Sequence, residues 1–305
     1  MRSAKSSGEP EHGYTGRFAP SPSGALHFGS LLAALASYLD ARAHRGQWLV
    51  RMEDLDPARE PPGAADQILR TLEAFGLHWD GQIVYQSQRQ AAYFEALEQL
   101  QHQSLTFPCT CSRKRIKAIG GVYDGKCRQR QSPPRHDFAT RLKVTDEMVC
   151  VADQIQGDFA QNLLHHCGDF ILQRRDGLIA YQLAVVVDDA WQQVTDIVRG
   201  YDLLDSTPRQ VFLQRLLGYP APEYAHIPVA ANDLGQKLSK QHFARPLLAS
   251  ESQQVIYKAL EFLGQLPPPE LASETTSIQI DWAIEHWDIH SVPKLANIPV
   301  SPMLS

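Results

Sequence analysis

The sequence predicts an α/β fold: a doubly wound parallel sheet with an inserted segment and a small helical part near the C-terminal end. Strand-like and helix-like segments alternate over residues 14–104. The segment Gln47–Met52 is apolar on both faces, as buried parallel strands are. Acidic residues follow it directly, and open sheets of this kind bind ligands at the carboxyl ends of their strands.

Composition limits the possible classes of protein. The 305 residues suggest about two domains, and 43% hydrophobic with 21% charged residues is ordinary for a globular core. A net charge of −5 argues against a generally basic nucleic-acid coat protein, but not against a local basic patch. Five cysteines, an odd number, indicate a reducing compartment. Residues 1–13 form a polar tail without a signal peptide, and no apolar run reaches membrane-spanning length, so we expect a soluble, cytoplasmic protein.

The first predicted strand, 14–19, ends at Pro20, which cannot continue a strand interior. A helix is expected from about residue 28 to residue 45. His27 and Gly29 lie where this helix begins, and exposed N–H groups at a helix start can hold a phosphate. This stretch alone leaves His27 equally open to two readings, a polar loop residue or a phosphate ligand.

Three carboxylates follow the second strand. Glu53, Asp54 and Asp56 lie at the carboxyl end of Gln47–Met52, where a ligand would bind. One interpretation is that Asp56 caps the next segment and the other two are solvated. We favour a functional role for Glu53.

The remaining patterns divide the chain into five parts. Helices are expected at 64–75 and 88–102, strand-like alternation at 138–151 and 168–174, and an apolar run ending in acids at 178–189. A strand at 194–200, a helix from Ser206 or Thr207 to Leu217 and a short strand at 227–229 follow, with further helices at 252–263 and 278–286. The predicted parts are a tail (1–13), the first half of the α/β domain (14–104), an insertion (105–178), the second half (179–250) and a C-terminal helical part (251–305).

The insertion contains a cluster of cysteines. Cys109, Cys111 and Cys127 make a three-thiolate zinc site plausible, and a tetrahedral site needs a fourth ligand. Tyr123 lies on the same loop, whereas His136 is the more conventional type of ligand. Alternatively, the cysteines are free and buried as small hydrophobic residues. A basic run surrounds them, either a solvated loop or a contact for a polyanion: Arg113, Lys114, Arg115, Lys117, Lys126, Arg128, Arg130 and Arg135.

Four segments, taken together and in order, resemble the class I aminoacyl-tRNA synthetases of the glutamate type. Two lysines on a loop, such as Lys237 and Lys240, usually face solvent and are a weak signal alone. The occurrence of all four segments in one chain is what makes the resemblance to this family specific. The segments are Arg17–Gly24 with His27–Ser30 (the "HIGH" signature), Arg51–Asp56 (the acidic strand end), Asp196–Gly200 (the specificity segment) and Lys237–Gln241 (the "KMSKS" loop). Ser30 replaces the second histidine of the first signature, and Gln241 replaces the final serine of the last. The resemblance covers about residues 14–250 and implies a Rossmann-type catalytic domain.

The length is similar to that of a truncated branch of this family. A full glutamyl-tRNA synthetase would continue into an anticodon-binding domain, and about 55 residues after position 250 are too few for one. The architecture resembles the glutamyl-queuosine tRNA(Asp) synthetases. That resemblance implies tRNA-independent activation of L-glutamate with ATP and Mg²⁺, then transfer to queuosine in the anticodon of tRNA(Asp), by a protein expected to be a monomer.

The resemblance also implies a role for each matching residue. Zinc would be bound by Cys109, Cys111, Tyr123 and Cys127, which favours Tyr123 over His136, and would be structural. The expected catalytic residues are His27, Lys237 and Lys240, with His27, Gly29 and Lys240 on ATP. Two arginines would pair with the glutamate carboxylates and Glu53 would accept from its ammonium group; the expected glutamate site is Arg17, Phe18, Ala19, Pro20, Ser21, Glu53, Tyr181 and Arg199.

Three other functions remain open at this point. The same chemistry could charge the 3′ end of a glutamate tRNA. A non-catalytic paralogue could bind tRNA or an amino acid, although His27 and Lys240 are both present. A nucleotidylyltransferase acting on another small acid would share the His-x-Gly turn, but would not need Arg17, Glu53 and Arg199 together.

Overall fold

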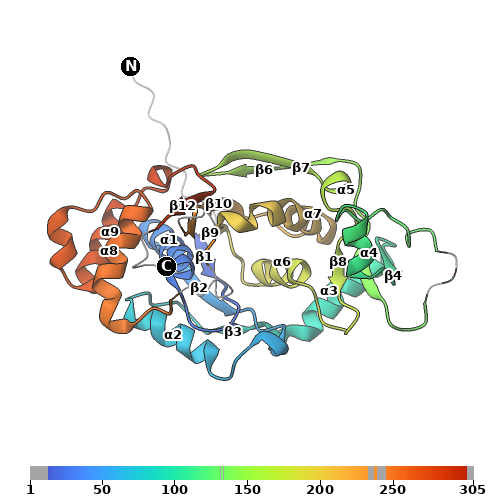
Figure 1. Cartoon of the computed structure of the whole chain (residues 1–305), viewed down its shortest axis with the longest axis horizontal. Coiled ribbons are helices and arrows are strands. Elements are labelled where there is room, and N and C mark those ends of the chain that lie inside the picture. The colour runs from blue at the N-terminus through green and yellow to red at the C-terminus, as the bar shows by residue number, and fades with distance from the viewer. Residues whose placement is uncertain (1–12, 131, 133, 233–236, 239–244, 301–305) are drawn as a thin grey trace, which may run out of the picture.

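The computed structural model describes residues 13–130, 132, 134–232, 237–238 and 245–300. Its main sheet contains β1 (Thr15–Phe18), β2 (Gln47–Met52), β3 (Val84–Tyr85), β6 (Met148–Asp153), β7 (Gly157–Asn162), β9 (Asp196–Gly200) and β10 (Glu223–Ile227). The strand order is β3-β2-β1-β9-β10-β6-β7, and the strands are parallel except for the β6–β7 hairpin (Figure 1). The predicted α/β fold is confirmed.

Helices cover both faces of this sheet and enclose two apolar cores. One core includes residues of α1 (Phe28–Ala43), α2 (Ala64–Ala74), α8 (Ser252–Phe262) and α9 (Thr276–His286). The other includes residues of α3 (Gln90–His102), α6 (Tyr181–Trp191) and α7 (Thr207–Leu217). Neighbouring strand residues divide between the cores, Ile197 and Tyr224 on one side and Val198 and Ala225 on the other, because side chains alternate along a strand.

The segment predicted as an insertion contributes to two sheets. It forms a small antiparallel sheet of β4 (Thr106–Cys109), β5 (Ala139–Leu142) and β8 (Ile171–Gln173), with α4 (Arg113–Ala118) and α5 (Leu163–His166), at the right of Figure 1. Its β6–β7 hairpin instead extends the main sheet, where Asp153 of β6 pairs with Tyr224 of β10. The insertion is thus joined to the α/β sheet by strand pairing.

Several elements differ from the predicted ones for local reasons. The apolar run at 178–189 forms helix α6, which is buried along most of its length. Ser206 occupies the N-cap position of α7, but its hydroxyl accepts from Gln182 Nε2 at 3.1 Å and makes no cap hydrogen bond. The short strand expected at 227–229 is interrupted at Pro228, which has no N–H to donate; β10 ends before it, and β11 (Val229–Ala231) pairs with β12 (Asn297–Pro299).

The order of the sheet reverses beside its first strand. β1 lies between β2 and β9, so the carboxyl ends of three strands from distant parts of the sequence are neighbours. Open α/β sheets bind ligands at such a reversal. Among the described residues, no helix is long and apolar enough to cross a bilayer.

Candidate active site

A cavity of about 960 Å³ opens at the carboxyl ends of β1, β2 and β9. This volume is at the upper end of the roughly 300–1,000 Å³ range of small-molecule sites. The predicted site residues that line it are Arg17, Phe18, Ala19, Pro20, Ser21, His27, Gly29, Glu53, Tyr181, Arg199 and Lys237. Lys240 lies outside the described residues. Eleven of the predicted site residues, about a third of the lining, thus lie in the wall of one cavity.

The turn after β1 brings the start of α1 to this cavity. The backbone N–H of Glu53 donates to Pro20 O at 2.9 Å, which ties the turn to the end of β2. His27 is the N-cap residue of α1, and its Nδ1 accepts from the backbone N–H of Ser30 at 3.3 Å. A Cβ added at Gly29 would lie only 3.2 Å from the His27 ring, so a glycine at this position lets the ring pack closely against the first turn of α1. A helix N-terminus beside a histidine suits an anionic group such as a phosphate.

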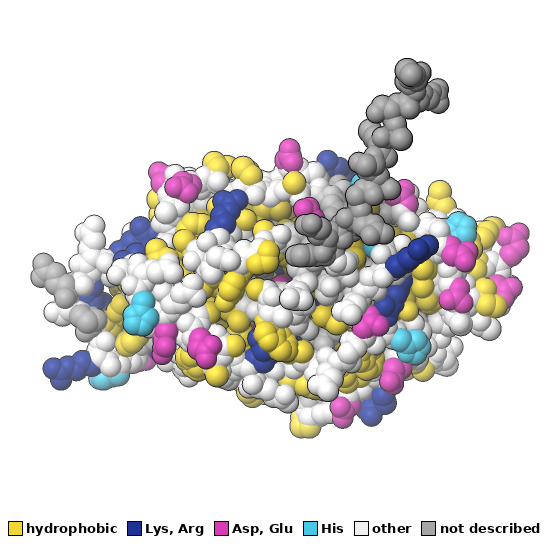
Figure 2. Space-filling model, turned by 180° about the vertical axis from the view of Figure 1, so that it is seen from behind, with side chains coloured by type: hydrophobic (Ala, Val, Ile, Leu, Met, Phe, Trp, Pro, Cys, Tyr) yellow, Lys and Arg dark blue, Asp and Glu magenta, His cyan; other side chains and the backbone are white. Residues whose placement is uncertain are grey.

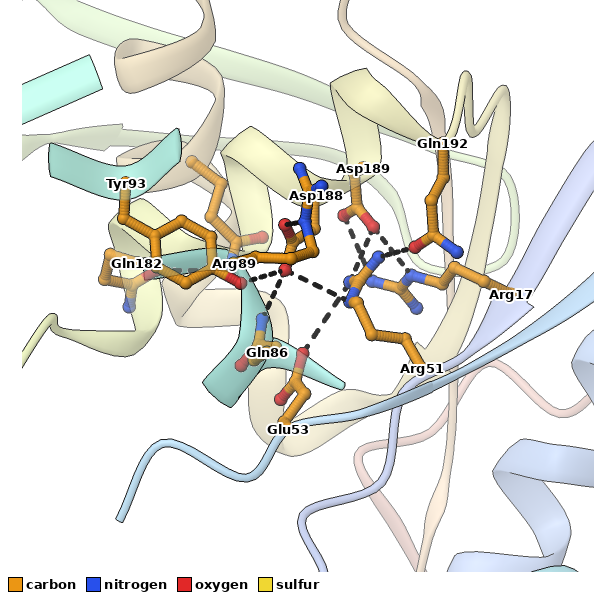
Figure 3. A network of polar contacts seen from close by, with 11 residues as sticks. Arg17, Arg51, Glu53, Gln86, Arg89, Tyr93, Gln182, Asp188, Asp189 and Gln192 are labelled. Atoms are coloured by element: carbon orange, nitrogen blue, oxygen red, sulfur yellow. Dashed lines mark hydrogen bonds and ion pairs between the residues drawn. The ribbon is translucent and has the colours of Figure 1, made fainter. Parts of the chain in front are cut away.

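Arg17 lies in a buried ion-pair network (Figure 3). Its Nε donates to Asp189 Oδ1 at 3.2 Å, and Arg51 Nη2 donates to the same oxygen at 2.7 Å. Burial opposes ionisation of Asp189, but the two arginines outweigh it and lower the pKa of this carboxyl. Arg17 therefore already has an anionic partner of its own chain, which it shares with Arg51.

The neighbouring acid, Asp188, has a second set of partners in the same network (Figure 3). It accepts from Arg89 Nε at 2.6 Å, from Gln86 Nε2 at 2.8 Å and from Tyr93 Oη at 2.7 Å. Arg89 also stacks on Trp191, with 3.7 Å between its guanidinium carbon and the ring centroid. These contacts hold the end of α6 behind the cavity.

Arg199 has a different environment, although it is also buried. Its Nε donates to His226 Nε2 at 3.0 Å and its Nη2 to Thr207 Oγ1 at 2.8 Å, and neither partner is a carboxylate. Its Nη1 is buried and has no hydrogen-bond partner among the described residues. Leaving a buried charged donor unpaired is costly, so a side chain of this kind in a cavity wall favours an anionic ligand.

Glu53 also lies in the cavity wall. Burial raises its pKa to about 7, against the lowering effects of Arg51 and Arg17. Its Oε1 lies 3.7 Å from Arg51 Nη2, too far for a hydrogen bond, and is buried without a hydrogen-bond partner among the described residues. A carboxylate with an open oxygen can accept from an ammonium group.

Tyr181 and Lys237 complete the predicted set in the cavity. Tyr181 begins α6, and burial raises the pKa of its phenol, which keeps the hydroxyl protonated. Lys237 is exposed and its Nζ pairs with Asp202. The backbone N–H of Leu238 donates to Ala230 O at 2.8 Å, which fixes this short segment beside β11.

The cysteine cluster has the geometry of a tetrahedral thiolate site. The sulfur atoms of Cys109, Cys111 and Cys127 all lie within 4.8 Å of one another, and those of Cys111 and Cys127 are 3.7 Å apart. Zn–S bonds of about 2.3 Å require sulfur separations of about 3.8 Å. Tyr123 Oη lies 3.7 Å from Cys109 Sγ, whereas His136 is not part of the group. The three cysteines are compatible with a zinc ion, and the Tyr123 hydroxyl lies beside them.

Sequence reasoning missed the partners that hold the predicted arginines. Arg51, Asp189 and His226 were given no role. Arg51 could have been found, because a charged residue inside an apolar strand needs a buried partner. Asp189 could also have been found, because it is one of two acids that end an apolar run. Nothing in the local pattern around His226 pointed to Arg199, because strand pairing brings them together.

Three comparisons with known proteins show the family and the fold of this chain. Residues 15–263 match the family described as tRNA synthetases class I (E and Q), catalytic domain. The chain is 53% identical over 281 residues to a protein of Ectopseudomonas mendocina named glutamyl-Q tRNA(Asp) synthetase, covering 92% of this chain and 95% of that protein. A Pseudomonas aeruginosa protein of the same name is 53% identical over 286 residues, with 94% and 97% covered. The crystal structure of glutamate-tRNA synthetase from Elizabethkingia anophelis superposes with a TM-score of 0.80 and 25% identity, covering 96% of this chain and 69% of that one.

Proposed function

Because the chain belongs to the glutamyl-Q tRNA(Asp) synthetases, within the class I tRNA synthetases for E and Q, we propose that it activates L-glutamate with ATP and transfers it to queuosine in the anticodon of tRNA(Asp). The chain is an enzyme, a ligase that uses ATP. Activation proceeds without tRNA, and the protein acts as a monomer.

The buried and incompletely paired Arg199 carries this proposal. Arg17 is ion-paired with Asp189, but Arg199 has only neutral partners and an open Nη1 in the cavity wall. A substrate carboxylate supplies the missing anion, and Glu53 accepts from the substrate ammonium group. Tyr181 adds a hydroxyl, and the turn Phe18–Ser21 closes the glutamate subsite. Glutamine would leave Arg199 uncompensated in a partly dry site, so glutamate is preferred.

In the first step an oxygen of the glutamate α-carboxylate attacks the α-phosphorus of ATP. The bond to the bridging oxygen breaks, and pyrophosphate leaves with the electron pair and its charge. No protein nucleophile is needed, so the protein contributes positioning and electrostatic stabilisation. His27, Gly29 and the start of α1 hold the phosphates, and Lys237 and Lys240 stabilise the charge that develops on the leaving group. Mg²⁺ would accompany ATP as part of the substrate and would neutralise phosphate charge.

Zinc has a separate role in this proposal. Cys109, Cys111, Tyr123 and Cys127 would hold it, and the ion would tie the end of β4 to the segment that follows it. None of the four lines the cavity. We therefore assign the division of the chain as predicted, with catalytic halves at 14–104 and 179–250, a zinc-binding insertion at 105–178 and a C-terminal helical part at 251–305.

A transfer assay tests the proposed acceptor. Radiolabelled glutamate and ATP are incubated with the enzyme and with tRNA(Asp) that contains or lacks queuosine. We expect label to appear on the queuosine-containing tRNA. The control lanes, with tRNA that lacks queuosine, should remain empty. Pyrophosphate exchange without tRNA should depend on glutamate. Equal labelling of both tRNAs, lost when the 3′ end is oxidised with periodate, would instead identify a charging enzyme for the 3′ end.

A further inference from the structure

A buried histidine links the insertion to Arg199. His226 on β10 is completely buried, with Nδ1 at 2.5 Å from Asp153 Oδ2 and Nε2 at 3.0 Å from Arg199 Nε. Strand pairing creates this alignment: His226 pairs with Arg199 across β9 and β10, and Asp153 of β6 pairs with Tyr224, two residues before His226 in β10. Neither His226 nor Asp153 lines the cavity, so neither is placed to touch a ligand there.

The bonds to Arg199 and Asp153 determine where the imidazole carries its proton; Thr207 Oγ1 is a third neighbour, 3.2 Å from His226 Nε2. An arginine Nε always carries hydrogen, so His226 Nε2 must accept and is unprotonated. The proton of the neutral ring is then on Nδ1 and donates to Asp153. The surroundings favour the neutral form: burial lowers the pKa of His226, and the Arg199 and Arg17 guanidinium groups lower it further, against the raising effect of Asp153.

We propose that Asp153 and His226 are positioning residues for glutamate recognition, in which Asp153 selects the Nδ1–H tautomer so that His226 Nε2 fixes the Arg199 guanidinium for a substrate carboxylate. Two of the three guanidinium nitrogens are held, Nε by His226 and Nη2 by Thr207, and the third is left open. A guanidinium fixed in its plane loses less conformational entropy on binding a carboxylate. This inference rests on the proposed role of Arg199 as a reader of glutamate.

Asp153 offers an unusually specific substitution. Its Oδ1 accepts three backbone N–H groups, from Ile155 at 3.1 Å, Gln156 at 2.8 Å and His226 at 3.2 Å. In Asp153→Asn these donors keep the amide oxygen at the Oδ1 position and therefore place the NH₂ group against His226 Nδ1. The ring must then accept at Nδ1 and carry its proton on Nε2, where it opposes the Arg199 Nε–H. The shape of the side chain is kept, but the tautomer of His226 is reversed.

The kinetic test uses glutamate-dependent pyrophosphate exchange. We expect Asp153→Asn to raise the KM for glutamate about 10- to 100-fold. The reason is that the buried Arg199 Nε–H loses its acceptor, His226 Nε2, and faces a second donor instead. The KM for ATP should stay unchanged and kcat should fall much less than the KM rises. Asp146→Asn is the matched control, since Asp146 and His165 form an exposed Asp–His pair in the same insertion, 3.1 Å apart. A KM for glutamate in Asp153→Asn equal to that of Asp146→Asn would overturn the proposal.

A second pair of variants tests the acceptor itself. The amide oxygen of His226→Gln can occupy the position of Nε2 and accept from Arg199, whereas His226→Phe has no acceptor. We expect the glutamine variant to keep the KM for glutamate within about fivefold of the parent and the phenylalanine variant to resemble Asp153→Asn. Equal KM values in the two histidine variants, with equal thermal stability, would contradict an acceptor role.

A spectroscopic measurement separates this inference from the proposed function. Long-range ¹⁵N–¹H correlation spectra report which imidazole nitrogen carries hydrogen, and the signal absent from His226→Gln identifies His226. We expect Nδ1–H in the parent and Nε2–H in Asp153→Asn. Nε2–H in the parent would overturn the inference even if glutamate is the substrate. Conversely, Nδ1–H in a protein without glutamate-dependent exchange would leave the tautomer assignment in place and refute the proposed function.

Discussion

Arg17 and Arg51 share one carboxylate, Asp189, inside the protein. Both arginines and the aspartate are almost fully buried, and Arg51 Nη2 and Arg17 Nε lie 2.7 and 3.2 Å from the same oxygen. A charge in such a position is tolerated only while its partners are present. The acid is therefore needed for folding as well as for the orientation of Arg17.

Removing this shared acid should destabilise the protein strongly. We expect Asp189→Ala to lower the free energy of unfolding by about 3–5 kcal/mol, because two buried guanidinium groups lose their anion. Urea denaturation measures the change. Glu261→Gln is the control: it breaks the exposed pair between Lys258 and Glu261 and should cost less than about 1 kcal/mol. Similar losses in the two variants would show that the buried network contributes no more than a surface pair.

Glu53 gives the site a pH dependence. Its pKa is raised to about 7 by burial, and only the ionised form accepts from an ammonium group. The KM for glutamate should therefore fall about tenfold as the pH rises from ~6 to ~8. The free energy of unfolding changes in the opposite direction, because the raised pKa means that the folded chain favours protonated Glu53. The stabilisation from this proton is complete below pH 4.5 and is lost as the pH rises through 7.

The matching variant removes the titrating group. Glu53→Gln should show a higher KM for glutamate that is flat over the same pH range. The measurement is pyrophosphate exchange at saturating ATP, with the KM for ATP as internal control. A pH dependence that persists in Glu53→Gln would assign it to another group.

At the level of elements, the zinc cluster should stabilise the insertion without taking part in the chemistry. Cys127 lies in the cluster and outside the cavity wall. We expect one zinc per chain by elemental analysis, and Cys127→Ser should lose it and lower the Tm by about 5 °C or more. Glutamate-dependent pyrophosphate exchange should persist in Cys127→Ser at temperatures below its lowered Tm. Cys150→Ser, at an exposed cysteine outside the cluster, is the control and should keep its zinc. An unchanged zinc content in Cys127→Ser would refute the ligand assignment.

Local sequence patterns predicted individual elements well and their pairing poorly. β2 has the predicted bounds, Gln47–Met52, because a compact apolar segment between turn residues has one local solution. The β6–β7 hairpin could not be placed, because its pairing with β10 depends on residues 71 positions away along the chain in the register Asp153–Tyr224.

The same division applies to the site. Motif residues such as Arg17 and Glu53 lie beside predicted turns and were found from the sequence. Their partners were not, since Arg17 and Asp189 are 172 positions apart and Asp153 and His226 are 73 apart. Motifs mark residues of the cavity wall, whereas the side chains that orient them depend on the assembled sheet.

At the level of the whole molecule, charge is unevenly distributed along the long axis. The basic run predicted from the sequence belongs to the insertion around α4, and its Arg113, Lys114 and Lys117 are not buried. Figure 2 shows Asp and Glu side chains grouped at the opposite, right-hand end, over α8 and α9. A polyanion such as tRNA is therefore attracted to the insertion and repelled by the C-terminal helices, an effect that salt screens.

The β6–β7 hairpin has a consequence for how this chain can be re-engineered or can diverge. Residues 105–178 look like a removable module, but their Asp153 completes the hydrogen-bond chain that ends at Arg199. A chimera that grafts a foreign insertion onto this scaffold must keep a carboxylate at the end of β6, or His226 loses its partner. Substitutions at Asp153 and at Arg199 are therefore expected to covary, although the two residues are 46 positions apart in the sequence.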